Sequence, residues 1–164
     1  MNLCCSQLEA KQSLKNYIML KLFISYSHKD ESKVCDFITY MTPLTTGENK
    51  LLDIWYDRNI KAGDDFWDEI ESHLADRDIV CLFLSKDYIA SGACRHEMEK
   101  ALEMRQRYGI MVIPVILSKC RWLEVNPNLK KLLAATKDAK EINSYQTEDE
   151  GWDDVYEHLK DAAE

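Results

Sequence analysis

One stretch constrains the fold of this chain more than any other, the residues from Asp78 to Tyr108. It begins with an apolar run, Ile79–Leu84, whose length and lack of charge predict a buried strand. A polar crossing that includes Ser91 and Gly92 follows, and a helix is expected from about Ala93. With about 100° per residue around a helix, one face of it is almost entirely apolar. That face carries Cys94, Met98, Ala101, Leu102, Met104 and Tyr108.

Glu97 falls on the same apolar face, in the first turn of the expected helix. A carboxylate that faces a sheet must be paired, protonated or used for chemistry. Its stem is too short to carry the charge back to water, as the longer stem of Arg105 can. Two interpretations stay open from the residues alone. Glu97 is either a structural carboxylate, which caps the first turn or pairs with Arg95 or His96, or a functional group.

Composition limits the classes of protein that this chain can belong to. It has 164 residues, 46% hydrophobic and 30% charged, which fits one globular domain with a full core. The net charge of −8 argues against nucleic acid as a partner. No apolar run approaches the roughly 20 residues needed to span a bilayer, and no secretory signal is recognisable. The six cysteines lack metal-ligand spacing, so we expect reduced thiols, no metal and a cytoplasmic protein.

Apolar runs alternate with helical patterns along most of the chain. Residues 1–19 are expected to be an N-terminal extension, either a short helix or a frayed segment, and residues 20–164 the domain. Strands are expected at Leu20–Ser25, Leu51–Tyr56, Ile79–Leu84, Ile110–Leu117 and, weakly, Ala139–Ile142. A Ser27-x-x-Asp30 capping box starts a helix that ends near Met41, and a last helix has its apolar stripe at Trp152, Val155, Tyr156 and Leu159. Pro114 inside the fourth strand predicts a bulge or an unpaired position.

Such alternation predicts an α/β fold, a flavodoxin-like, doubly wound parallel sheet of five strands with helices on both faces. The expected strand order is 2-1-3-4-5. Ligands of such sheets bind at the carboxyl ends of the strands, near the switch between strands one and three. The loops at that edge would be Tyr26–Asp30, Asp57–Asp65 and Ser85–Ala93. Glu97 is therefore expected at the ligand-binding edge.

Five short motifs follow one another along the chain in the order and spacing of a known family. They are Phe23–Asp30, Ile54–Asp57 with Ile60 and Gly63, Leu84-Ser85 with Ser91, Cys94-x-x-Glu97, and Ile113–Val115 followed by Trp122. From about Leu20 to Leu159 the chain resembles a Toll/interleukin receptor (TIR) domain of the bacterial, NAD-cleaving type. A receiver domain needs paired acids after strand one, where this chain has Ser25-Tyr26. A nucleoside deoxyribosyltransferase fits less well, and no phosphate-binding glycine motif is present.

The resemblance implies a set of site residues. Glu97 matches the catalytic glutamate of TIR enzymes that cleave the nicotinamide–ribose bond of NAD. Substrate-binding positions would be Tyr26, Ser27 and His28 in the first loop, Arg58, Ile60, Gly63 and Phe66 in the second, and Ala93 and Trp122. Trp122 resembles an aromatic that stacks on a base from a neighbouring subunit in assembled members. Ala93 stands where catalytic relatives often have an aromatic wall of the cleft.

Partners and products also follow from the resemblance. NAD would be the substrate, with no metal or second cofactor, and the product would be ADP-ribose or a cyclic ADP-ribose. Activation is expected through homotypic assembly with other TIR domains, in bacterial immune signalling such as antiphage defence. A sensor or effector would then lie on a separate protein, unless this sequence is a fragment of a longer chain. The alternative function is a non-enzymatic module that only docks other TIR domains.

Overall fold

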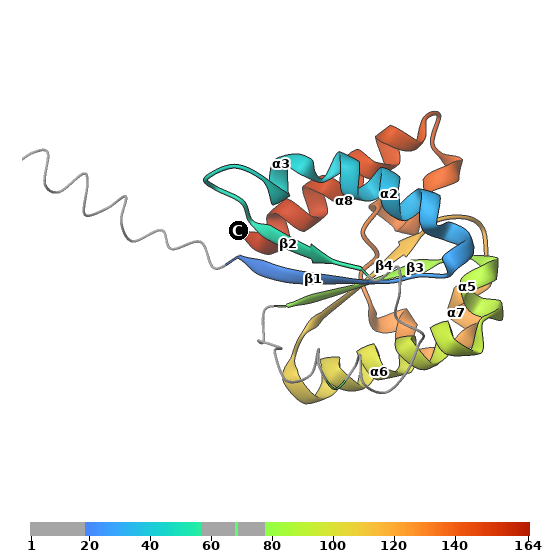
Figure 1. The fold of residues 1–164 in the computed structure, drawn as a ribbon. Coiled ribbons are helices and arrows are strands. Elements are labelled where there is room, and N and C mark those ends of the chain that lie inside the picture. Colours follow the sequence, from blue (N-terminus) through green and yellow to red (C-terminus); the bar gives the residue numbers. More distant parts are fainter. Residues whose placement is uncertain (1–18, 57–67, 69–77) are drawn as a thin grey trace, which may run out of the picture.

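The computed structural model describes residues 19–56, 68 and 78–164 of the chain. A parallel four-stranded sheet forms its centre, in the order β2-β1-β3-β4 (Figure 1). The strands are β1 (Leu20–Ser25), β2 (Leu52–Trp55), β3 (Ile79–Leu84) and β4 (Met111–Ile116). The predicted α/β class, the parallel pairing and the order of the first four strands are confirmed.

Helices cover both faces of this sheet. On one face lie α2 (Glu31–Tyr40), α3 (Thr42–Thr45) and α8 (Glu148–Ala163), and on the other α5 (Lys86–Ala90), α6 (Gly92–Tyr108) and α7 (Trp122–Val125) (Figure 1). Four short 3₁₀ helices complete the described elements: η1 (His28–Asp30), η2 (Pro127–Lys131), η3 (Lys137–Ala139) and η4 (Ile142–Ser144).

The two-sided cover explains the continuous apolar run of β3. Successive side chains of a strand point to opposite faces. Ile79, Cys81 and Phe83 accordingly join the core beneath α2 and α8, whereas Val80, Leu82 and Leu84 join the core beneath α5 and α6. All six are fully buried.

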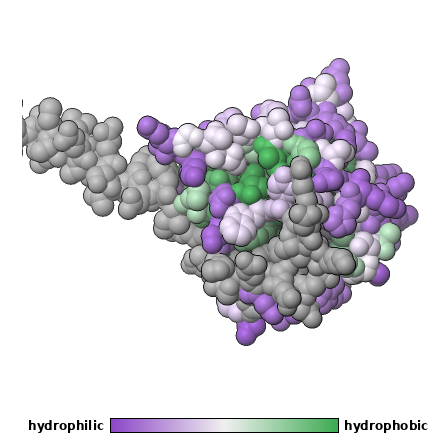
Figure 2. Space-filling model, viewed as in Figure 1, coloured by the Kyte–Doolittle hydropathy of each residue, from purple (hydrophilic) through white to green (hydrophobic). Residues whose placement is uncertain are grey.

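At the edge of the sheet opposite β4, β2 is the outermost described strand. Its Trp55 is 43% exposed, lies 5.8 Å from the Phe23 ring and has the Lys21 ammonium 5.6 Å from its own ring. Figure 2, in the same view as Figure 1, shows a small apolar area near the centre of the molecule, with residues of intermediate and hydrophilic character beside it.

Pro114 causes no bulge, contrary to the expectation from the sequence. It pairs in regular register with Leu82. The N–H and C=O of a strand residue point to the same side, and the Pro114 carbonyl accepts a hydrogen bond from Ala135 N at 2.9 Å, away from β3. The missing N–H therefore also faces outward, where it costs no bond between β3 and β4.

The expected fifth strand at Ala139–Ile142 is wrong. Those residues belong to η3, η4 and the turn between them. Asp138 and Ala139 have φ of 56° and 53°, which lie in the left-handed region and are incompatible with a strand. Residues on either side of it reach the outer edge of the sheet: Ala135 N donates to Pro114 O of β4, and Asn143 N donates to Leu117 O just after β4.

The helix that contains Glu97 begins at Gly92, close to the expected start near Ala93, because the Ser91 hydroxyl accepts from Cys94 N and caps it. The helix expected to end near Met41 is α2, and a separate helical turn, α3, follows it with Pro43 near its start. One smaller expectation is wrong: Tyr108, assigned to the buried face, is 38% exposed beside Arg107.

Several predictions fall on residues that the structure does not describe. They are the short helix within residues 1–19, of which only Met19 is described, the loop Asp57–Asp65, and the site residues Arg58, Ile60, Gly63 and Phe66. They stay predictions.

Candidate functional site at the carboxyl edge of the sheet

Glu97 lies at the carboxyl end of β1. Its Oε2 accepts a hydrogen bond from the hydroxyl of Ser25, the last residue of β1, at 2.5 Å. Ser25 pairs with Leu82 of β3, so the carboxylate lies beside the two strands where the direction of winding reverses. Because α6 begins at Gly92, Glu97 is in its second turn, and Ser91 supplies the cap. The capping interpretation of Glu97 is therefore wrong.

The surroundings of Glu97 favour its neutral form. Burial is the largest cause and raises the pKa of the Glu97 carboxyl above its ordinary value. The hydrogen bond from Ser25 opposes this shift, as do the nearby imidazoles of His28 and His96. Glu97 is thus partly desolvated, while Ser25, His28 and His96 favour its charged form. This combination is typical of functional carboxylates.

The loop after β1 brings two predicted residues to this carboxylate. Tyr26 is buried and its ring meets His28 edge-on at 6.1 Å. The Cys94 thiol lies 3.6 Å from the Tyr26 carbonyl, which fixes the loop against the first turn of α6. His28 is exposed and acts on the charge of Glu97. These contacts bring Tyr26, His28 and Glu97 to one place.

Ser27 has a structural task in the described fold. Its hydroxyl accepts from Lys29 N at 3.4 Å and caps η1. The predicted capping box is right about the helix start but wrong about Asp30, whose carboxylate accepts instead from the Ser85 hydroxyl at 2.5 Å.

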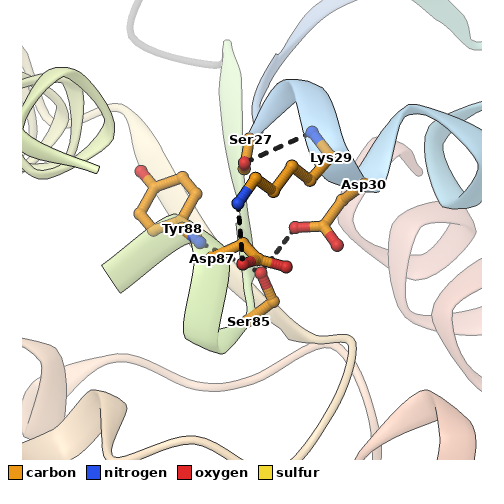
Figure 3. Close-up of polar contacts among 6 residues, drawn as sticks. All are labelled: Ser27, Lys29, Asp30, Ser85, Asp87 and Tyr88. Atoms are coloured by element: carbon orange, nitrogen blue, oxygen red, sulfur yellow. Dashed lines mark hydrogen bonds and ion pairs between the residues drawn. The ribbon is translucent and has the colours of Figure 1, made fainter. Parts of the chain in front are cut away.

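This contact is one of two that fasten the β1 loop to α5 (Figure 3). The second is the ion pair between Lys29 Nζ and Asp87 Oδ1 at 3.7 Å. Ser85 also accepts from Tyr88 N and so caps α5. Burial raises the pKa of Asp30, and the Ser85 bond opposes that shift.

Ala93 and Trp122 are the other predicted site residues that the structure describes. Ala93 is exposed in the first turn of α6. Trp122 begins α7 and is half-buried against the core beneath α5 and α6, as ordinary rim packing would place it.

Sequence reasoning missed Ser25 and Tyr88 as neighbours of Glu97. The Tyr88 hydroxyl lies 2.8 Å from Ser25 Oγ, and both residues are buried. The available signal was a serine at the end of each of two adjacent apolar strands, namely Ser25 as the last residue of β1 and Ser85 directly after β3.

The described residues include neither a candidate metal site nor a candidate membrane span. Within them, no cluster of three or more His, Cys, Asp or Glu side chains is placed to hold a metal ion. Nor do they include a helix with the length and apolar character needed to cross a bilayer.

Comparisons with known proteins agree with this architecture. Residues 22–160 match the family described as TIR domain. The chain is also 34% identical over 146 residues to "Uncharacterized protein y4lF" of Sinorhizobium fredii (strain NBRC 101917 / NGR234). That alignment covers 88% of this chain and 44% of the relative, so the chain spans less than half of that protein. The chain belongs to the TIR family.

The raised pKa of Glu97 predicts that Glu97→Gln stabilises the fold at neutral pH. A folded-state pKa above the unfolded value means that the folded state binds more protons, so stability falls as pH rises between the two values. The uncharged glutamine amide does not titrate, so this loss of stability does not occur in the variant. Its carbonyl oxygen can still accept the hydrogen bond from the Ser25 hydroxyl. We expect a higher melting temperature for Glu97→Gln than for the natural chain at pH 8, and no such gain near pH 4.

Thermal unfolding followed by circular dichroism across that range measures the effect. Glu99→Gln is the matched control, because Glu99 is exposed on the same helix. A Glu97→Gln chain that melts lower than the natural one by the same amount at every pH would contradict the assignment.

Proposed function

We propose that this TIR domain cleaves the nicotinamide–ribose bond of NAD, with Glu97 as the catalytic residue. One observation carries the proposal: a partly buried carboxylate accepts a hydrogen bond from the end of β1, beside the β1/β3 switch point. This is the edge at which sheets of this kind bind ligands.

The reaction suits a single carboxylate. Nicotinamide in NAD is a pyridinium cation, so the electron pair of the breaking C1′–N bond neutralises the leaving group, and positive charge develops on the ribose. A preorganised anion near C1′ stabilises that charge. A carboxylate can also hold the ribose hydroxyls and orient the sugar. Because the leaving group carries its own activation, the step needs no metal and no second cofactor.

The acceptor decides the product. Water that attacks C1′ gives ADP-ribose and loses one proton to the medium. An adenine nitrogen of the same molecule gives a cyclic ADP-ribose instead. Ala93 stands where catalytic relatives often have an aromatic, and we expect the smaller side chain to alter the choice of acceptor.

Binding would involve residues from several loops. Tyr26, Ser27 and His28 would contact NAD from the β1 loop, with Ala93 beside them. Arg58, Ile60, Gly63 and Phe66 would come from the loop after β2, and Trp122 from α7. In a homotypic assembly, the loop after β2 and Trp122 of one copy would complete the site of a neighbour. Such an enzyme would consume cytoplasmic NAD in bacterial immune signalling.

Chromatography of the products tests the proposal. The purified chain, incubated with NAD over a concentration series up to conditions that promote assembly, is expected to release nicotinamide together with ADP-ribose or a cyclic isomer. The rate per molecule should rise with protein concentration, because neighbours complete the site.

A docking module is the second candidate, and the small, exposed Ala93 favours it. TIR domains associate with other TIR domains, and association alone needs no aromatic wall. This candidate predicts concentration-dependent self-association in analytical ultracentrifugation with no nicotinamide released at any concentration.

A further inference from the structure

A chain of hydrogen bonds links Tyr88, Ser25 and Glu97. Tyr88 OH lies 2.8 Å from Ser25 Oγ, and Ser25 Oγ lies 2.5 Å from Glu97 Oε2. The three residues come from three elements, α5, β1 and α6. Tyr88 is fully buried, and its phenol points away from the Asp30–Ser85 contact (Figure 3).

The number of available protons fixes which group donates in each of these two hydrogen bonds. A serine hydroxyl has one proton, and an ionised carboxylate has none. With Glu97 ionised, the Ser25 proton must lie on the bond to Glu97, so the Ser25–Tyr88 bond requires the phenol proton. Tyr88 therefore donates to Ser25, and Ser25 donates to Glu97.

We propose that Tyr88 is a positioning residue for the Glu97 carboxylate. It acts through Ser25, because Tyr88 donates to Ser25 and Ser25 donates to Glu97 in a relay of two hydrogen bonds. Such chains strengthen bond by bond, because each donor is polarised by the one before it. The bond that ends on a charged carboxylate is stronger than a neutral one, so the relay favours ionised over protonated Glu97. The proposal rests on the proposed function only for its effect on catalysis.

The phenol is well suited to this role. Burial raises the pKa of Tyr88 well above its ordinary value, so it stays protonated and remains a donor. Tyr88 is fixed in turn by α5, whose cap Ser85 bonds Asp30 of the β1 loop. The relay thus connects the Glu97 carboxylate to α5, which is itself held against the β1 loop by the Asp30–Ser85 hydrogen bond.

Other groups also act on Glu97, and the test must separate them from the relay. His28 of η1 and His96 of α6 favour its charged form. The Cys94 thiol and the Tyr88 phenol are themselves affected by the Glu97 charge. All of these except Tyr88 remain unchanged in the variant Tyr88→Phe.

The experiment measures the titration of Glu97 directly. In the 164-residue chain labelled with ¹³C at glutamate side-chain carboxyls, the Glu97 signal is assigned from its loss in Glu97→Gln. Tyr88→Phe keeps the buried ring and removes only the hydroxyl. We expect the titration midpoint of Glu97 to move to higher pH in Tyr88→Phe, and further in Ser25→Ala. Tyr40→Phe is the matched control, since the Tyr40 hydroxyl bonds Asp153 far from the site.

Kinetics with NAD give the second readout. Loss of one hydrogen bond in the relay predicts a kcat about three- to tenfold lower in Tyr88→Phe, with KM little changed. The acid limb of the rate profile should move upward with the Glu97 midpoint.

The outcomes separate the relay from the proposed function. A Glu97 midpoint that is the same in Tyr88→Phe and the natural chain overturns the relay, whatever the activity. A midpoint that moves in a protein that releases no nicotinamide supports the relay and overturns the proposed function.

Discussion

Glu97→Gln is expected to lower nicotinamide release from NAD by about 10²- to 10³-fold, the usual cost of removing a preorganised electrostatic group from a site. Glutamine keeps the length and shape of the side chain, and its carbonyl can accept the hydrogen bond that Ser25 now donates to the carboxylate. The variant therefore removes the charge and leaves the surrounding fold in place. The rate falls because developing positive charge on the ribose no longer has an anion beside it. Quantitative chromatography of nicotinamide, at matched protein concentration, measures the loss.

The control for this variant is on the same helix. Glu99 is exposed two residues further along α6, and Glu99→Gln removes the same charge from the same element. We expect its rate to stay within about twofold of the natural chain, as for most surface substitutions. Equal rates in Glu97→Gln and Glu99→Gln would show that the carboxylate of Glu97 is not the catalytic group.

The second large effect concerns the core beneath α2 and α8. Trp152→Ala is expected to lower the free energy of unfolding by about 3–5 kcal/mol, the usual range for a buried aromatic. Trp152 is 1% exposed and stacks on Phe83 of β3 with ring centroids 6.1 Å apart. It also meets Phe37 of α2 at 5.7 Å, so its removal leaves a cavity where α2, α8 and the sheet join. Urea unfolding followed by circular dichroism measures the loss.

Two further variants separate the causes. Within the described residues Trp152 Nε1 has no hydrogen-bond partner, so Trp152→Phe should cost much less than Trp152→Ala. Trp55→Ala removes an indole that is 43% exposed and should cost about 1 kcal/mol or less. If Trp152→Ala and Trp55→Ala cost the same, the packing described for α8 is wrong.

The layered fold follows from patterns that are local in the sequence. Ile79–Leu84 could be assigned because a charge-free run of this length fits a strand covered on both faces. The last helix could be assigned because Trp152, Val155 and Leu159 recur at helical spacing, and all three are buried. The same kind of argument failed at Ala139, where two consecutive left-handed residues turn the chain and no residue type there requires such a turn.

The site could be predicted only in part, and for a physical reason. Glu97 was recognisable because a short carboxylate stood on an apolar helix face. Its partners were not, since Ser25 is 72 positions before it and Tyr88 contacts Ser25 across 63 positions. No local pattern encodes contacts of that range, because the parallel crossovers of the sheet create them. Serines such as Ser25 and Ser85 have ordinary composition and become distinctive only when the strand ends meet.

The most direct test of the account compares two titrations of the same group. The acid limb of kcat/KM for NAD cleavage reports the ionisation of the essential carboxylate in the free enzyme. If Glu97 is the catalytic group, this midpoint coincides with the Glu97 midpoint from ¹³C carboxyl NMR of the free protein, and both lie above the ordinary value of 4.5. A rate profile whose acid limb falls at a different pH from the Glu97 titration would contradict that assignment.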